Sequence, residues 1–91
     1  MRTIALTEKA RSDLLSIHEY YVANAGPKVA TGIILHLLEK LDPLTIFSSM
    51  GRPALRPGVR ELVFARYPFL ALYRINDQEI QVIRIRHQRN A

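Results

Sequence analysis

The four residues Asn-Ala-Gly-Pro at positions 24–27 constrain the fold of this chain more than any other feature of its sequence. Gly26 suits the left-handed backbone that follows a helix, and Pro27 suits the first position of the next helix, where its missing amide hydrogen costs nothing. One helix is therefore expected to end at this joint and another to begin at once. Two helices joined so tightly form a hairpin, which must bury its apolar stripe against another layer.

Apolar residues at helical spacing on both sides of this joint predict the two helices. The first is expected from Glu8 to about Ala23, with the hydroxyl of Thr7 accepting a hydrogen bond from a free amide of its first turn. The second is expected from Pro27 to about Leu41, and Pro43 ends or kinks it. The apolar stripes consist of Ala10, Leu14, Ile17 and Tyr21 in the first helix, and of Val29, Ala30, Ile33, Ile34, Leu37, Leu38 and Leu41 in the second.

Four short segments have strand character, and three of them follow one another near the end of the chain. The stretch from Thr45 to Gly58 is rich in Ser, Gly and Pro and is expected to be a loop, whereas Asn76 to Gln78 suits a tight hairpin. The expected strands are Arg2–Leu6, Arg60–Phe64, Phe69–Ile75 and Glu79–Arg86. The order strand, helix, helix, strand, strand, strand predicts an α+β fold, with the helix hairpin packed on one face of a mostly antiparallel sheet.

Length and composition narrow the class of protein. The 91 residues, 48% of them hydrophobic, are expected to form a single domain spanning residues 1–91. The apolar runs are far shorter than the ~18 to 20 residues of a membrane span, and the charged N-terminus lacks signal-peptide features, so we expect a cytoplasmic protein without a membrane partner. There are no cysteines, and the three histidines lack metal-ligand spacing, so neither a metal nor a cofactor is expected.

The last expected strand alternates isoleucine with arginine near its end. A strict period of two puts Ile83, Ile85 and His87 on one face of this strand. Arg84 and Arg86 then share the other face with the apolar residues further upstream, Ile80 and Val82. This second face is therefore expected to change from apolar to cationic where the strand emerges into a groove.

The formal net charge of +5 indicates an acidic partner. Arg60 and Arg66, on or beside neighbouring strands, are expected to converge with the arginines of the last strand on one side of the sheet. Nucleic acid and an acidic protein segment satisfy the same electrostatics. The alternative is that the arginines of the last strand pair with Glu61 or Glu79, or are simply solvated.

Four stretches of the chain carry a family resemblance: LTEKARSDLLSIHEYY, MGRPALRPGVRELVF, YPFLALYRI and IQVIRIRHQR. They contain a Gly-Arg loop, an Arg-Glu-Leu entry into a strand, a Tyr-Pro-aromatic turn, and a final strand that finishes in His-x-Arg. In this order and spacing the sequence resembles the ParE branch of the RelE/ParE toxin superfamily, over nearly its whole length. The fold of that superfamily agrees with the order of elements read from the periodicity.

The resemblance implies the toxin half of a type II toxin–antitoxin system. Toxins of the ParE branch arrest growth, and where their target is understood they poison DNA gyrase. The implied neutralising partner is an acidic, ParD-like antitoxin that folds as it binds. The toxin alone is not expected to bind specific DNA sequences. The residues expected to bind partners are Arg60, Arg66, Arg84, Arg86, His87 and Arg89.

The alternative branch, resembling RelE, consists of ribosome-dependent messenger RNA endoribonucleases. Such a nuclease would rely here on His87, Arg84 and Arg60 for proton transfer and for the phosphorane charge. Three departures weaken this alternative: Ser48 or Ser49 replaces a carboxylate of that branch, Leu70 replaces a basic residue, and Gln88 replaces a tyrosine after the histidine. No catalytic residue is therefore expected, and His87 is expected to end the strand and hydrogen-bond the hairpin or the chain terminus.

A third reading, from another class, is a small basic module that binds RNA or DNA without toxicity. Single-strand binding uses an aromatic stacking platform, but Tyr67, Phe69 and Tyr73 are expected in the core. Neither expected helix has a recognisable basic face for reading bases. This reading stays open beside the other two.

Overall fold

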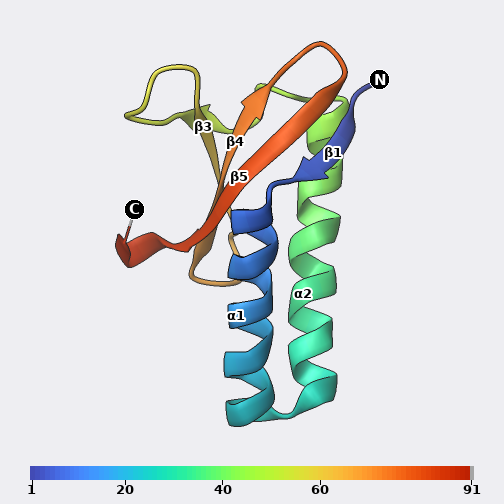
Figure 1. The fold of residues 1–91 in the computed structure, drawn as a ribbon, viewed down its shortest axis with the longest axis vertical. Helices are drawn as coiled ribbons and strands as arrows, with labels where there is room; N and C mark the ends of the chain where they lie inside the picture. The colour runs from blue at the N-terminus through green and yellow to red at the C-terminus, as the bar shows by residue number, and fades with distance from the viewer. Residues whose placement is uncertain (91) are drawn as a thin grey trace.

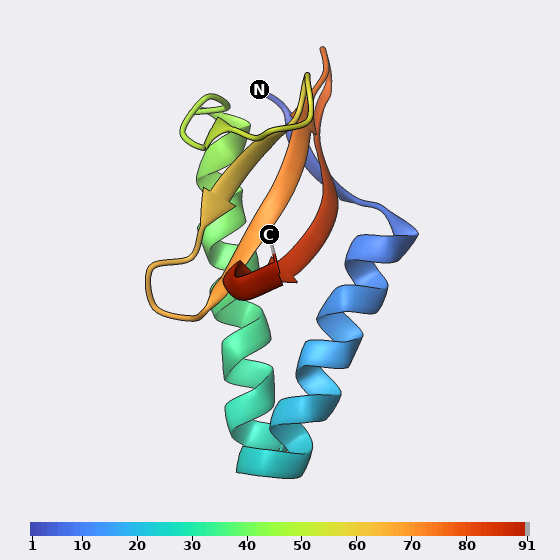
Figure 2. The same cartoon turned by 90° about the vertical axis from the view of Figure 1, so that its left-hand side faces the viewer.

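The computed structural model describes residues 1–90, so Ala91, the last residue of the predicted domain, lies outside the described residues. Its elements are β1 (Thr3–Leu6), α1 (Glu8–Ala25), α2 (Pro27–Leu41), a 3₁₀ helix (Asp42–Thr45), β2 (Arg52–Pro53), β3 (Arg60–Val63), β4 (Phe69–Ile75), β5 (Glu79–His87) and a second 3₁₀ helix (Gln88–Asn90). The helices form a hairpin on one side of the sheet and continue beyond it (Figures 1 and 2). The predicted α+β fold is confirmed, and the short β2 within the expected loop is an addition to it.

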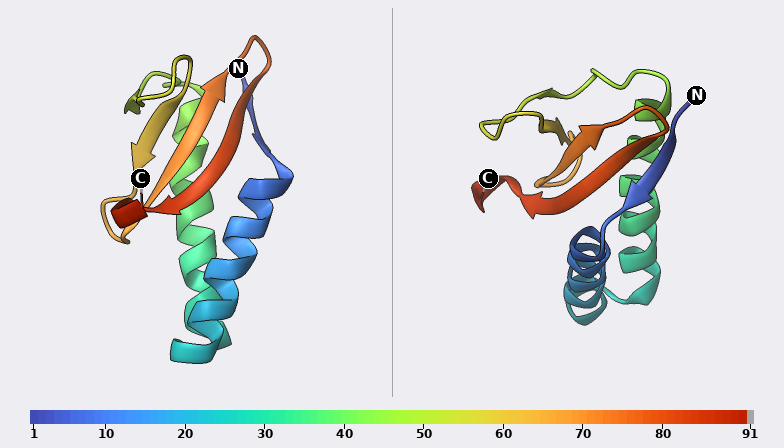
Figure 3. Two further views of the ribbon diagram at one scale, coloured as in Figure 1. Left: turned by 60° about the vertical axis from the view of Figure 1, so that its left-hand side comes forward. Right: turned by 45° about the horizontal axis from the view of Figure 1, so that its top comes forward.

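The sheet has five strands in the order β1-β5-β4-β3-β2. Neighbouring strands are antiparallel, except that β1 runs parallel to β5 (Figure 3). The parallel pair arises because the chain leaves β1 through the helix hairpin before it returns to the sheet. Since β1 ends at Leu6 and β5 continues to His87, the second half of β5 extends past its parallel neighbour.

The helix hairpin forms as the joint at residues 24–27 predicts. The Oγ1 atom of Thr7 accepts a hydrogen bond from the Ala10 amide at 3.1 Å and caps α1. Gly26 has a φ of 91°, which favours glycine, and α1 ends two residues later than expected, at Ala25. No helix among the described residues combines the length and the apolar character needed to cross a membrane.

The core lies between the hairpin and the helix-facing side of the sheet. Its buried members include Leu14, Ile33, Leu37, Leu41, Phe64, Phe69, Tyr73, Ile80, Val82 and Ile85. The predicted stripe of α2 was too wide: Val29 is 49% exposed and Leu38 is 36% exposed. The buried residues of α2 are Ala30, Ile33, Leu37 and Leu41, and Ile34 packs against this core from one flank.

A bulge in β5 overturns the strict alternation expected for the last strand. The pairing between β4 and β5 shifts between Leu72 and Tyr73: Val82 is paired with Tyr73, but Arg84 is paired with Leu72. Ile83 is therefore an extra residue, and the side chains that follow it change face. The prediction that Ile80 and Val82 share a face with Arg84 and Arg86 was wrong, because the apolar pair faces the helices and both arginines line the opposite side of the sheet.

Candidate functional site

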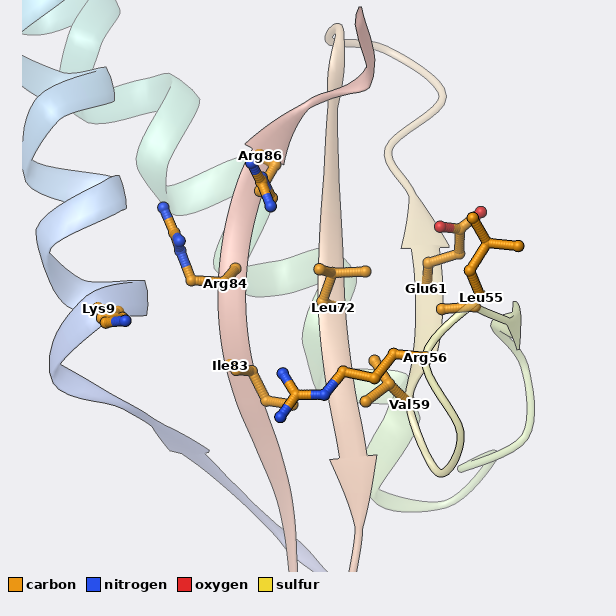
Figure 4. A pocket seen from close by; sticks show the side chains of 10 residues that line it. Lys9, Leu55, Arg56, Val59, Glu61, Leu72, Ile83, Arg84 and Arg86 are labelled. Atoms are coloured by element: carbon orange, nitrogen blue, oxygen red, sulfur yellow. The ribbon is translucent and has the colours of Figure 1, made fainter. Parts of the chain in front are cut away.

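A groove of about 350 Å³ lies on the face of the sheet that the helices do not cover. Leu72 of β4 and Ile83 of β5 form its half-buried floor, and Val59 closes it on the loop side. Figure 4 shows Arg56 reaching from the loop across β4 toward Ile83. The residues that line the groove are Lys9, Ala54, Leu55, Arg56, Val59, Glu61, Leu72, Ile83, Arg84 and Arg86. An apolar floor with a mostly cationic rim suits a segment that is apolar on one side and acidic on the other.

Strand register brings the groove residues together. Glu61 of β3 is paired with Leu72 of β4, which is paired with Arg84 of β5, so the three side chains form a row across the outer face of the sheet. The bulge at Ile83 adds an apolar side chain next to this row. The bulge thus gives the groove a cation beside its apolar floor, because strict alternation from Val82 would have turned Arg84 toward the helices.

The loop that forms one wall of the groove is fastened to the core by Tyr73. The hydroxyl of this buried tyrosine donates to the Ser48 carbonyl at 2.8 Å and accepts from the Gly51 amide at 2.9 Å. A Cβ atom at position 51 would lie only 2.6 Å from the Glu61 carbonyl oxygen and 2.7 Å from the tyrosine hydroxyl. The Gly-Arg loop motif therefore has a packing explanation, because only glycine fits beside Tyr73.

Arg60 also serves this loop. Its Nε and one terminal nitrogen donate to the Gly51 carbonyl at 3.0 and 2.6 Å, and the same terminal nitrogen donates to the Ser49 carbonyl at 3.2 Å. Because Arg60 is paired with Tyr73, its side chain starts from the helix-facing side of the sheet. Arg60 is therefore placed to hold the loop, and it does not line the groove.

Arg84 is bound within the chain by Asp13 of α1. The Arg84 Nε donates to one Asp13 oxygen at 2.8 Å, and a terminal nitrogen donates to the other at 3.0 Å. The Ile85 amide donates to the same carboxylate at 2.9 Å. Partial burial raises the pKa of Asp13, but these hydrogen bonds and the charges of Arg84 and Arg86 outweigh it, so the pKa lies below its ordinary value of 3.8. The pKa of Arg84 is raised in return.

The other predicted partner-binding residues are spread over the molecule. Arg66 lies over the ring of Tyr67, 5.7 Å from its centroid, in a separate hollow beside α2. The ring of His87 packs edge-on against Phe69 on the helix-facing side, and the exposed Arg89 donates its amide to the Nδ1 of His87. The predicted convergence of Arg60 and Arg66 with Arg84 and Arg86 was therefore wrong: only the last two line the groove.

Sequence reasoning assigned no site role to three charged residues that shape this groove. Lys9 and Arg56 line the groove, and Asp13 holds Arg84. Lys9 and Asp13 are four residues apart on α1, a spacing that puts them on one helix face, but no sequence signal says which strand that face meets. The three contacts to Asp13 join residues 71 and 72 positions apart, which is why local patterns do not reveal them.

The described residues contain no cluster of three or more His, Cys, Asp or Glu side chains able to hold a metal ion. Two ion pairs exist among residues 1–90, between Arg84 and Asp13 and between Arg52 and Glu61. The acidic residue that lines the groove, Glu61, is therefore already bound to a cation. The charged lining of the groove therefore consists of this paired glutamate together with Lys9, Arg56, Arg84 and Arg86.

Comparison with known proteins identifies the family. The family described as ParE toxin of type II toxin-antitoxin system, parDE, matches residues 4–91. The chain belongs to the ParE toxin family. Toxin ParE3 of Caulobacter vibrioides is 30% identical to it over 87 residues, which cover 93% of this chain and 85% of that protein. Toxin RelE2 of the same organism is 31% identical, with 96% of each chain covered.

Solved structures agree with this family assignment. The chromosomal ParDE system from P. aeruginosa contains a chain that superimposes on this ParE family member with a TM-score of 0.89 and 37% identity, over 96% of both chains. The RelBE2 toxin–antitoxin complex of Mycobacterium tuberculosis gives a TM-score of 0.58 at 22% identity, over 94% of this chain and 96% of the other. The second likeness shows the shared fold alone. The predicted membership of the ParE branch is confirmed, and the chain is a ParE-like toxin of a type II toxin–antitoxin system.

Proposed function

We propose that this ParE-like toxin arrests growth by binding DNA gyrase in the cytoplasm, and that an acidic antitoxin neutralises it by folding onto the groove face of the sheet. Family membership supports the gyrase target. The observation that carries the antitoxin part is the composition of the groove: Lys9, Arg56 and Arg86 surround an apolar floor, and none of the three belongs to an ion pair among the described residues.

An acidic, amphipathic segment is the partner that this groove favours. Apolar side chains of the segment would cover Leu72 and Ile83, and its carboxylates would meet the three unpaired cations. A net charge of +5 on the toxin accelerates encounter with such a segment. A disordered segment would lose conformational entropy when it folds on the groove, and the contacts with the apolar floor and the cations would oppose that loss.

A binding mechanism without catalysis is supported by the separation of the residues that a nuclease would use. His87 lies against Phe69 on the helix-facing side of the sheet, whereas Arg84 lies on the other side, bound to Asp13. The guanidinium of Arg60 is occupied by loop carbonyls. A phosphorane needs an acid, a base and a cation converging on one point, and these three residues have different neighbours.

Expression of the chain in bacteria, alone and together with the protein encoded beside it, tests the toxin proposal. We expect growth arrest that the neighbouring protein relieves, and loss of supercoiling when the purified chain is added to gyrase and relaxed plasmid. Primer extension on a translated message should reveal no new ends. Growth arrest with intact gyrase activity and with new messenger ends that disappear in His87→Ala would replace this proposal by the RelE-type nuclease.

A further inference from the structure

Asp13 occupies the place where the sheet loses its parallel neighbour. Beyond Leu6 the chain turns into α1, so the edge of β5 is no longer paired with a strand. Side chains take over: the Thr7 hydroxyl donates to the Ile83 carbonyl at 2.8 Å, and Asp13 accepts from the Ile85 amide at 2.9 Å. The first turns of α1 are thus fastened to β5 along the rim of the groove.

The same carboxylate neutralises one of the groove arginines. The Arg84 guanidinium makes two parallel hydrogen bonds to Asp13, and Figure 4 shows its side chain directed toward α1 and away from Leu72. The side chain of Asp13 is 18% exposed and that of Arg84 is 35% exposed, so the carboxylate is the better shielded partner of the pair. Asp13 occupies the Nε edge of the Arg84 guanidinium and balances its charge, so a partner's carboxylate would gain less at Arg84 than at an unpaired cation.

We propose that Asp13 is a positioning residue of the groove: it holds Arg84 against α1, so that Lys9, Arg56 and Arg86 carry the recognition of an acidic partner. This inference rests on the proposed function, because it distinguishes the cations of the same groove that contact the partner from the one that Asp13 already binds. It changes the expected roles of the two arginines in the last strand. Arg84 helps to attach α1 to the sheet, and Arg86 contacts the partner.

A poly-glutamate peptide of about 20 residues is a suitable probe, since it carries the charge of an acidic segment without a specific sequence. Its affinity is measured by calorimetry at about 0.15 M salt, where exposed charges more than about 8 Å apart are largely screened. We expect Arg86→Gln to weaken binding about two- to fivefold. The double variant Asp13→Asn with Arg84→Gln should bind within about twofold of the wild type, because it removes a pair that is already neutral.

Two further variants sharpen the comparison. Lys28→Gln removes an exposed charge at the start of α2, outside the groove, and controls for the loss of net charge. Asp13→Asn alone keeps an oxygen that can accept from the Ile85 amide but releases Arg84, so it should bind the peptide about two- to fivefold more tightly than the wild type. The Nε–H resonance of Arg84 should stay in place when wild-type protein is saturated with peptide.

The outcomes separate this inference from the proposed function. If the double variant weakens binding as much as Arg86→Gln does while Lys28→Gln has no effect, or if the Arg84 resonance moves with the peptide, Arg84 contacts the partner and the role assigned to Asp13 is refuted. If wild-type protein does not bind the peptide at all, the acidic-partner groove is refuted together with this inference. A melting temperature for each variant identifies any variant that fails to fold. In that case the Arg84 resonance of the wild type shows whether Arg84 contacts the peptide.

Discussion

Replacing Tyr73 by phenylalanine removes a single oxygen atom from the contact between the core and the groove loop. That oxygen donates to the Ser48 carbonyl at 2.8 Å and accepts from the Gly51 amide at 2.9 Å. The Gly51 amide is buried and would lose its acceptor, which costs about 1 to 3 kcal/mol, whereas the partly exposed Ser48 carbonyl can be hydrated again. We therefore expect Tyr73→Phe to lower the free energy of unfolding by about 2 kcal/mol.

Urea unfolding followed by circular dichroism measures this loss. For a domain of this size, about 2 kcal/mol corresponds to a fall in the melting temperature of about 8 to 16 °C. The dependence of the unfolding free energy on urea should not change, because the ring still fills its site and the buried area stays the same. Tyr20→Phe is the matched control, since Tyr20 is 61% exposed, and its change should stay within about 0.5 kcal/mol. A loss at Tyr73 no larger than in this control would refute the role of the hydroxyl.

Two further predictions concern stability. Gly51→Ala should destabilise the fold, because its Cβ would lie 2.6 Å from the Glu61 carbonyl oxygen. Gly32→Ala should stabilise the fold by up to about 1 kcal/mol, because Gly32 lies in a helix with open space around it. Thermal melts of the two variants measure both effects. The pKa of Asp13 is lowered in the folded state, so its ionised carboxylate contributes fully to the free energy of unfolding well above pH 3.8. This contribution is lost as the pH falls through the folded pKa. The unfolding free energies of Asp13→Asn and wild type should therefore converge in acid. A difference that stays constant from pH 7 down to pH 2 would contradict the second prediction.

Local chemistry in the sequence predicts much of this fold. The Gly26-Pro27 joint places the end of one helix and the start of the next, and Thr7 caps α1 as its position suggests. Apart from the two-residue β2 within the expected loop, the strand boundaries agree with the sequence pattern to within one residue, because turn residues separate the last three strands. These features depend on neighbours in the sequence, so the sequence alone suffices to find them.

The groove is harder to predict, because it depends on pairing between distant segments. The bulge at Ile83 arises where β5 is paired with β4, and a strict period of two then assigns the following residues to the wrong face. Arg60 and Arg84 are both arginines on expected strands, but Arg60 binds loop carbonyls and Arg84 binds Asp13. Which cations remain unpaired is a property of tertiary contacts, and side-chain chemistry alone does not indicate it.

The affinity of the toxin for its antitoxin is the most direct test of the groove as the neutralisation site. The proposed antitoxin is the protein encoded beside the chain that passes the growth-rescue test above. Its affinity is measured for wild type, for the double variant Arg56→Gln with Arg86→Gln, and for Lys28→Gln. We predict that the double variant weakens binding at least about tenfold and makes it less dependent on salt, because two charged contacts of about 1 kcal/mol or more each are lost. Lys28→Gln should bind as the wild type does. Unchanged affinity and salt dependence in a correctly folded double variant would place the antitoxin elsewhere and contradict the proposed role of the groove.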